Sequence, residues 1–205
     1  MLLVKGVYEM KYKQRKAQLT RQKLVEAARK MFELKGFQQC TMKDIITEAA
    51  VGYGTAYVYF PNKDTLFCEV IDTYIHKMLV VAGSPFTPAS VEEAIEKIEK
   101  QTEAFLRAAY EHREVFIIIE EAIRHSPIVE DKWKAVREHF VKGIKKDIEY
   151  VQQAGLSKQL DAALIAESWF HLNEHMLFSL VKQEHADVAH TAKTIVTLYT
   201  RGLYQ

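Results

Sequence analysis

Residues 41–63 read TMKDIITEAAVGYGTAYVYFPNK, and this stretch decides the fold class of the chain. It predicts two short helices joined by a tight turn. Thr41 is a favoured N-cap residue, and Asp44 completes an acidic variant of the capping box. The tripeptide Ala50-Val51-Gly52 is small enough for one helix to cross the next, as a helix-turn-helix requires. Pro61 then ends the second helix.

The second helix, expected over residues 53–59, carries more aromatic and hydroxyl side chains than packing alone requires. Residues near the start of such a helix reach base edges in the major groove of DNA, whereas hydroxyl and basic groups at helix ends meet the phosphates. The candidates for base contacts are Tyr53 and Thr55. The candidates for phosphate contacts are Thr41, Thr55, Tyr59 and Lys63. Tyr57 is either a further DNA contact or partly core.

This region resembles the TetR family of transcriptional regulators. The resemblance begins in LVEAARKMFELKGFQQCTMKDI (residues 24–45) and continues in AAVGYGTAYVYFPNKDTLF (residues 49–67). Gly52 stands where the family usually has a Ser or Thr cap, and Ala56 where a larger apolar residue is common; glycine caps nearly as well as serine. The resemblance implies an all-α chain. A three-helix helix-turn-helix DNA-binding domain would precede an α-helical ligand-binding and dimerisation domain.

Charge divides the chain at the same place. Residues 1–63 contain twelve basic and five acidic residues, a net charge of +7, and residues 64–205 contain sixteen basic and twenty-two acidic residues, a net charge of −6. A basic head on an acidic body suits a protein that meets phosphate with one end only, chance clustering being the weaker alternative. We therefore expect a DNA-binding domain at 1–63, with its helix-turn-helix at about 41–60, and an effector-binding and dimerisation domain at 64–205.

Helical periodicity continues on both sides of this unit, and strand patterns are absent. An amphipathic first helix ends at Gly36; its apolar stripe is Leu24, Ala27, Ala28, Met31 and Phe32. A basic arm precedes it and either contacts DNA or frays in solvent; its residues are Lys11, Lys13, Arg15, Lys16, Arg21 and Lys23. A long helix is expected over 64–81, followed by a break at Gly83-Ser84-Pro85. Further helices are expected at 90–111, 113–125, 127–154, 160–181 and 187–203.

The carboxyl-terminal part is dense in aromatic residues, which predicts an apolar effector site, although most such residues belong to a core by default. The apolar candidates are Phe105, Phe116, Trp133, Phe140 and Trp169. Glu120 and Asn173 are candidates for orienting the ligand, and a Glu120 that faces water is the alternative. This composition favours an acyl chain or an aromatic compound, while Glu120 leaves room for a cationic one.

The last two helices carry apolar stripes wide enough to bury against a partner helix. One stripe is Leu164, Ile165, Trp169, Leu172, Met176 and Leu180, and the other is Ala192, Ile195, Val196, Tyr199 and Leu203. The family resemblance implies that two such helices from each subunit form a four-helix dimer interface. On residue pattern alone, a core within one chain is an equally good interpretation.

Together these features predict a ligand-responsive DNA-binding regulator, most simply a repressor that an effector releases from its operator. One short recognition helix reads too few base pairs for specificity, so we expect a homodimer on a palindromic duplex. The effector would bind among the helices from 64 to 181 and alter the spacing of the two recognition units. The helix that starts at Asp64 is the expected mechanical link.

One motif favours a different class of protein. His171-Leu172-Asn173-Glu174-His175 matches the H-x-x-E-H pattern of certain zinc peptidases. A metal-binding helical protein or a peptidase is therefore the alternative, but so short a match is weak in a chain with eight histidines. We expect no enzyme activity, no metal and no cofactor, because no phosphate-cradling loop, nucleophile elbow or CxxC pair is present.

The two cysteines, Cys40 and Cys68, indicate no disulfide framework. The sequence contains no apolar run long enough to span a membrane and no signal peptide. We therefore expect a cytoplasmic protein without a membrane partner.

Overall fold

The structure, a computed structural model, describes the backbone of residues 2–82 and 85–203 and the side chains of residues 14–80 and 85–201. Within these ranges the chain is all-α, as predicted, and has no strand. Its helices are α1 (Leu2–Gln39), α2 (Met42–Ala49), α3 (Tyr53–Tyr59), α4 (Lys63–Ala82), α5 (Val91–Tyr110), α6 (Arg113–His125), α7 (Pro127–Gln153), α8 (Ala162–Leu180) and α9 (Val188–Leu203).

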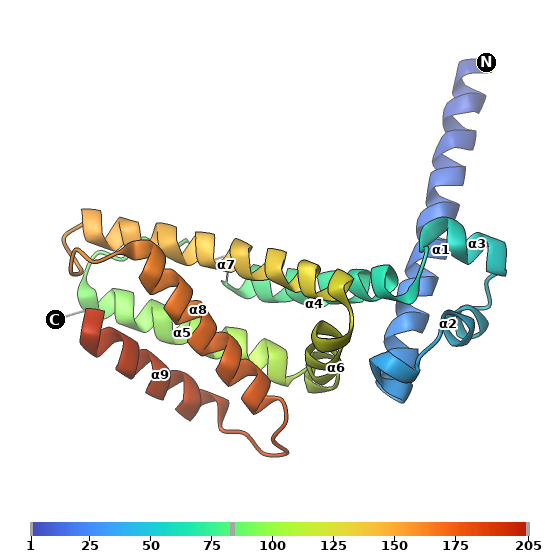
Figure 1. Cartoon of the computed structure of the whole chain (residues 1–205). Coiled ribbons are helices and arrows are strands. Elements are labelled where there is room, and N and C mark those ends of the chain that lie inside the picture. Colours follow the sequence, from blue (N-terminus) through green and yellow to red (C-terminus); the bar gives the residue numbers. More distant parts are fainter. Residues whose placement is uncertain (1, 83–84, 204–205) are drawn as a thin grey trace.

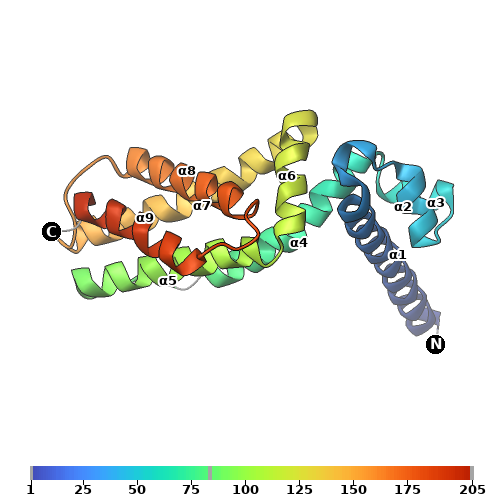
Figure 2. The same cartoon turned by 90° about the horizontal axis from the view of Figure 1, so that it is seen from below.

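The helices form a small head and a larger body (Figure 1). The head contains α2, α3 and the second half of α1, and the first half of α1 projects beyond it. The body is a bundle of α5 and α7–α9, with α6 at the end nearest the head. Helix α4 starts at the head and runs into the body, and the turned view in Figure 2 shows the same bridging position.

Local sequence signals explain the head. The capping box forms as predicted, because the Thr41 hydroxyl accepts from the Asp44 N–H and the Asp44 carboxylate accepts from the Thr41 N–H. Ala50 ends α2 in the left-handed conformation at φ 51°, and Gly52 is the N-cap of α3. The expected apolar stripe of α1 is fully buried. The boundaries of α3 coincide with the predicted 53–59.

Helix α1 breaks at Gly36, where the sequence predicts its end. Gly36 has φ 74° and ψ 171°, and a single turn follows it up to Gln39. Upstream, the expected basic arm continues the same helix back to Leu2 rather than forming a separate segment. The side chains of Lys11 and Lys13 lie outside the described residues, and Arg15, Lys16, Arg21 and Lys23 are exposed.

In the body, the observed helices begin and end within two residues of the predicted positions. Ser90, Ser126 and Asp161 cap α5, α7 and α8 through their side-chain oxygens. Pro127 occupies the first turn of α7, where its missing N–H costs nothing. Of the predicted break, Gly83 and Ser84 lie outside the described residues, and α4 ends at Ala82 just before them.

The apolar stripe of α9 has a different role from the one that the resemblance implies. Helix α9 packs along α5 of its own chain, and Ala192, Ile195 and Val196 are buried there. The alternative of a core within one chain therefore describes this stripe, except for Leu203, whose side chain lies outside the described residues. On α8 the predicted stripe is split, because Trp169 and Leu180 are buried whereas Leu164 is 62% exposed.

Candidate DNA-reading surface and effector cavity

Helix α3 presents most of its predicted contact residues to solvent. Thr55 is exposed, and Tyr53 and Tyr57 are 51% and 48% exposed, so Tyr57 is not a core residue. Tyr59 is half-buried and packs against the core. Ala56 is fully buried and packs α3 against the rest of the head, so the opposite side of α3 faces outward. The exposed positions form a polar and aromatic surface, and Val58 is its exposed apolar member.

The hydroxyl of Thr41 is occupied by its capping role. It donates to Asp44 Oδ2 at 2.7 Å, and Lys35 Nζ donates to Asp44 Oδ1 at the same distance. The hydrogen bond from Lys35, followed by those from Thr41, lowers the pKa of Asp44 to about 2. Thr41 is exposed at the start of α2, but its hydroxyl is already hydrogen-bonded as the N-cap of that helix.

Lys63 is placed differently from the sequence expectation. Its Nζ donates to the backbone carbonyls of Phe37, Gln38 and Cys40 at 2.6, 3.1 and 3.0 Å, and it lies 4.6 Å from the centroid of the Phe37 ring. The ammonium therefore satisfies carbonyl groups that α1 leaves free where it ends. This inward arrangement does not favour the expected phosphate contact.

We expect Lys63→Met to lower the melting temperature without changing how DNA affinity depends on salt. The variant keeps the aliphatic stem but removes the donor for three carbonyls, a loss of roughly 1–3 kcal/mol. Thermal unfolding measures the first effect, and DNA titrations at several salt concentrations measure the second. A salt slope lowered by about one unit would instead show that Lys63 contacts a phosphate.

A second contact joins the head to the body beside Lys63. The carboxylate of Glu121, on α6, accepts from the backbone N–H groups of Phe37 and Gln38 at 3.2 and 3.3 Å. Gly36 permits this approach, since a Cβ atom there would lie 3.3 Å from Glu121 Oε2 and its positive φ would strain any other residue. Helix α6 is thus hydrogen-bonded to the turn that precedes α2.

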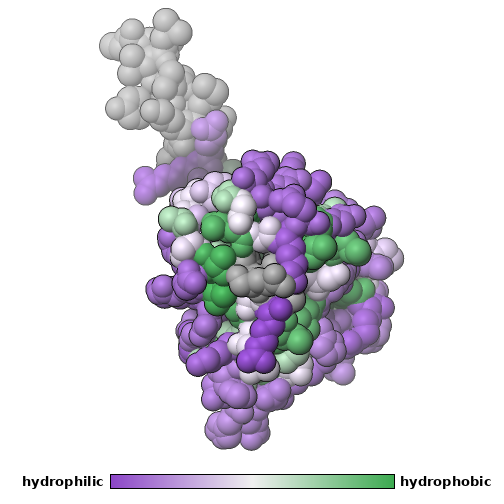
Figure 3. Space-filling view, turned by 90° about the vertical axis from the view of Figure 1, so that its left-hand side faces the viewer, coloured by the Kyte–Doolittle hydropathy of each residue, from purple (hydrophilic) through white to green (hydrophobic). Residues whose placement is uncertain are grey.

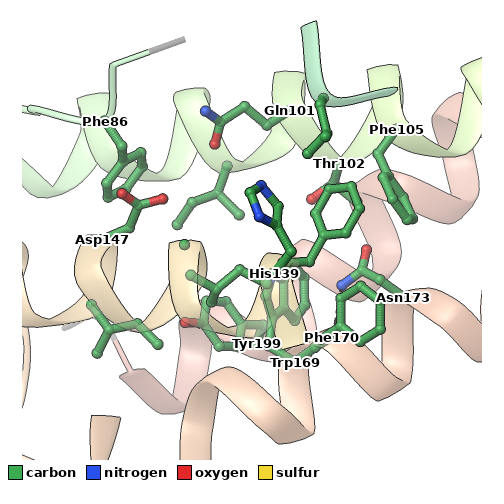
Figure 4. A pocket seen from close by; sticks show the side chains of 16 residues that line it. Phe86, Gln101, Thr102, Phe105, His139, Asp147, Trp169, Phe170, Asn173 and Tyr199 are labelled. Atoms are coloured by element: carbon green, nitrogen blue, oxygen red, sulfur yellow. Dashed lines mark hydrogen bonds between the residues drawn. The ribbon is translucent and has the colours of Figure 1, made fainter. Parts of the chain in front are cut away.

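The body contains a cavity of about 260 Å³ between α4, α5, α7, α8 and α9 (Figure 4). Most of its lining is apolar or aromatic. The volume lies near the lower limit of ligand pockets, which span roughly 300–1,000 Å³. The lining residues are Leu79, Phe86, Ile98, Gln101, Thr102, Phe105, His139, Phe140, Gly143, Ile144, Asp147, Ile148, Trp169, Phe170, Asn173 and Tyr199.

The end of the body remote from the head carries hydrophobic patches. Figure 3 views this end and shows hydrophobic patches on both sides of the middle of the face, with hydrophilic residues between them and along the rim. The cavity-lining helices α5, α7, α8 and α9 all reach this end (Figure 1).

The structure brings four of the seven predicted ligand residues together. Phe105, Phe140, Trp169 and Asn173 all line the cavity. The aromatic residues among them belong to a wall of rings, in which Phe140 stacks on Phe170, another lining residue, at 5.7 Å between centroids. Phe105 meets Phe140 edge-on at 5.6 Å.

The other three predicted residues lie outside the cavity. Phe116 is fully buried between α6 and α4, where its ring meets Tyr74. Glu120 forms ion pairs with Lys182 at 2.8 Å and Arg124 at 3.3 Å. Trp133 donates its indole N–H to Glu174 at 2.6 Å. Each is held by a partner from another turn or helix, which the sequence pattern could not reveal.

The predicted ligand residues did not include three residues of α7 that line the cavity. His139, Gly143 and Asp147 are spaced at i, i+4 and i+8, and all three line the cavity. A signal for Asp147 existed, because it falls within the apolar stripe formed by Phe140, Ile144 and Ile148. A carboxylate on the buried face of an amphipathic helix is unusual.

Burial raises the pKa of Asp147 to about 6, and no neighbouring charge contributes to that shift. Since the unfolded chain has the lower pKa, the folded state holds this proton between about pH 4 and pH 6. The carboxyl group therefore favours folding most at acidic pH, and this contribution is lost as pH rises through about 6.

We expect Asp147→Asn to raise the melting temperature at neutral pH, because it removes the cost of ionising a half-buried carboxyl group. The advantage over the wild type should grow between about pH 4 and pH 6 and stay constant above. Melting curves of both proteins across this range measure the effect. An advantage that did not vary with pH would show that the carboxyl is well solvated.

The H-x-x-E-H motif does not assemble into a metal site. Glu174 is buried and accepts hydrogen bonds from Trp133 at 2.6 Å and Arg137 at 2.7 Å, while His171 and His175 are exposed. Among the described residues, no group of three or more His, Cys, Asp or Glu side chains could hold a metal ion. The motif's glutamate thus joins α7 to α8.

Within the described ranges, no helix combines the length and the apolar character needed to cross a membrane. Comparison with known proteins matches two regions of the chain. Residues 24–70 match the family described as bacterial regulatory proteins, tetR family, and residues 98–205 match the transcriptional regulator EthR, C-terminal domain. The second match covers more than half of the chain and contains most of the cavity.

Individual relatives agree over nearly the whole length. The HTH-type transcriptional regulator YhgD of Bacillus subtilis is 28% identical over 188 residues, which is 90% of this chain and 97% of that protein. EthR of Mycolicibacterium smegmatis is 24% identical over 85% of this chain and 80% of its own. A solved TetR-family regulator from Syntrophomonas wolfei superposes with a TM-score of 0.74 at 18% identity, covering 89% of this chain and 94% of that one.

Proposed function

We propose, from the premise that this chain belongs to the TetR family of transcriptional regulators, that it is a repressor which a small effector releases from its operator. The effector would occupy the cavity between α4, α5, α7, α8 and α9. Helix α3 would read the major groove through Tyr53, Thr55 and Tyr57. As a transcriptional regulator, the protein needs no catalytic chemistry for this role.

The observation that supports this proposal is that helix α4 contacts both the DNA-reading head and the effector cavity. Helix α4 begins at Lys63, whose side chain holds the end of α1 in the head, and Leu79 near its other end lines the cavity. A ligand that displaces the cavity wall can therefore move the start of α4 and the recognition unit beside it. The Glu121 contact from α6 offers a second route.

The energetic requirement for such a switch is modest. An effector need only bind the arrangement that does not fit DNA more tightly than the arrangement that does, and a differential of roughly 1–3 kcal/mol suffices. The head meets α4 through the rings of Phe32 and Phe37, which both pack on Phe67, so a displacement of α4 carries the head with it. The closely packed bundle of α5 and α7–α9 would stay rigid while α4 moves relative to it.

We further propose that the repressor is a homodimer on a palindromic operator. The short α3 can contact only a few base pairs, and two-fold symmetry doubles the site. The two carboxyl-terminal helices offer exposed apolar side chains for the interface. Leu164 on α8 is 62% exposed, and Leu198 on α9 is 69% exposed. Large exposed apolar side chains on adjacent helices suit a partner surface.

The test is selection of DNA from a random duplex library by the full-length protein, followed by fluorescence anisotropy with the selected sequence. We expect enrichment of a palindrome and specific binding that weakens with salt. Tyr57→Ala should reduce specific affinity about tenfold or more, as loss of a base or phosphate contact does. Tyr150→Ala, which truncates an exposed tyrosine of α7 in the body, is the matched control and should bind normally.

Failure of the library to yield any enriched sequence would contradict a specific regulator. Enrichment of a site without two-fold symmetry would contradict the dimeric arrangement alone. Equal losses in the Tyr57 and Tyr150 variants would show that α3 is not the reading element.

A further inference from the structure

We propose that the effector is an amphiphilic amine, whose protonated nitrogen pairs with the Asp147 carboxylate while its apolar body fills the aromatic part of the cavity. This inference rests on the proposed function of the cavity as the effector site. It replaces the expectations of an acyl chain and of a cation held by Glu120, whose carboxylate is already paired with Lys182.

The charge of the lining selects the sign of the ligand. Asp147 is the carboxylate among the lining residues, and no Lys or Arg is among them. The other titratable groups are His139 on α7 and Tyr199 on α9, whereas α4, α5 and α8 contribute none to the described wall. A ligand carboxylate or phosphate would enter this cavity without a fixed cation to receive it and would be repelled by Asp147.

In the described part of the chain the Asp147 carboxylate has no partner, and a ligand could provide one. Among the described residues it takes part in no hydrogen bond or ion pair. Figure 4 shows its side chain rising from α7 into the space beside Phe86, in the same direction as His139. Burial without a partner raises the pKa of this carboxyl to about 6, and an ammonium in the cavity would reverse that effect.

The remaining wall suits the apolar body of such a ligand. Trp169 stacks on Tyr199 at 4.1 Å between centroids, and Phe140 stacks on Phe170 at 5.7 Å. The faces of aromatic rings attract cations, so these rings are compatible with a ligand that carries an ammonium group. A cavity of about 260 Å³ equals roughly nine water volumes. The ligand should therefore have on the order of ten non-hydrogen atoms.

The experiment compares three probes of nearly equal size that differ in charge: octylamine, 1-octanol and octanoate. Calorimetric titration of the full-length protein near neutral pH should rank their affinities in that order, with octylamine about tenfold tighter than 1-octanol. In Asp147→Asn, octylamine should weaken about tenfold towards the alcohol, 1-octanol should stay unchanged and octanoate should improve.

The pH dependence gives an independent readout. At about pH 5 some nine-tenths of Asp147 is protonated, so octylamine should bind roughly tenfold more weakly than near neutral pH, while 1-octanol should not change. The control is His139→Gln, since His139 also lines the cavity and lies on the same helix. If Asp147 is responsible, this variant keeps the dependence.

Three results would overturn the inference: octanoate binding as tightly as octylamine, octylamine affinity unaffected by Asp147→Asn, or no octylamine binding at millimolar concentration. Operator release by the neutral probe, 1-octanol, tests the proposed function separately. Release by 1-octanol without amine preference would leave the repressor proposal standing and refute cation recognition. Octylamine binding that depends on Asp147 but does not release DNA would support cation recognition in the cavity and contradict the proposed repressor mechanism.

Discussion

Gly143→Leu is expected to abolish binding of cavity ligands while leaving the protein folded and more stable. Gly143 lines the cavity on α7, and no atom lies within 4 Å of the position that its Cβ would take. A leucine can therefore extend into the empty space and occupy what a ligand would fill. We expect affinity for octylamine and 1-octanol to fall by on the order of 100-fold, measured by calorimetric titration.

The stability gain has two parts. Replacing a helical glycine contributes about 1 kcal/mol, and because Gly143 is exposed the leucine adds only part of the roughly 1.5–3 kcal/mol of full burial. The melting temperature should rise by roughly 2–4 °C per kcal/mol for a chain of this size. Gly143→Ala is the matched control, because it gains the helix term but fills little space and should bind ligands nearly as the wild type does. If Gly143→Leu bound both probes normally, ligands would occupy another part of the molecule.

Leu198→Asp is expected to separate the proposed homodimer and, with it, to remove specific operator binding. Leu198 is 69% exposed on α9, so the aspartate should not disturb the core of a single chain. In a dimer interface, however, two symmetry-related carboxylates would be buried without partners. Analytical ultracentrifugation should show a monomer, and operator affinity should fall about 10³-fold to the level of non-specific binding.

Ile128→Asp is the matched control for this prediction. Ile128 is an exposed apolar residue in the first turn of α7, where an acidic group is favourable to the helix. This variant carries the same change of charge but should remain dimeric and bind the operator. Should Leu198→Asp also stay dimeric, the interface lies on a surface other than α9.

The sequence by itself determined the elements and the head, because the signals for them are local. A capping box spans three residues, an apolar stripe repeats every turn, and glycine or proline marks each helix end within a few positions. Thr41, Asp44 and Gly52 therefore have the roles in the structure that their neighbours in the sequence indicate. The exposed side chains of α3 follow from the same periodicity.

Only the tertiary structure decided which side chains remain available for binding, because that depends on partners distant along the chain. Lys63 is taken up by carbonyl groups of residues 37–40, and Glu120 by Lys182, sixty-two residues later. Asp147 faces the cavity and has no such partner among the residues that the structure describes. The free energy of a buried charge depends on whether a partner lies within hydrogen-bond distance, and periodicity along one helix carries no information about that distance.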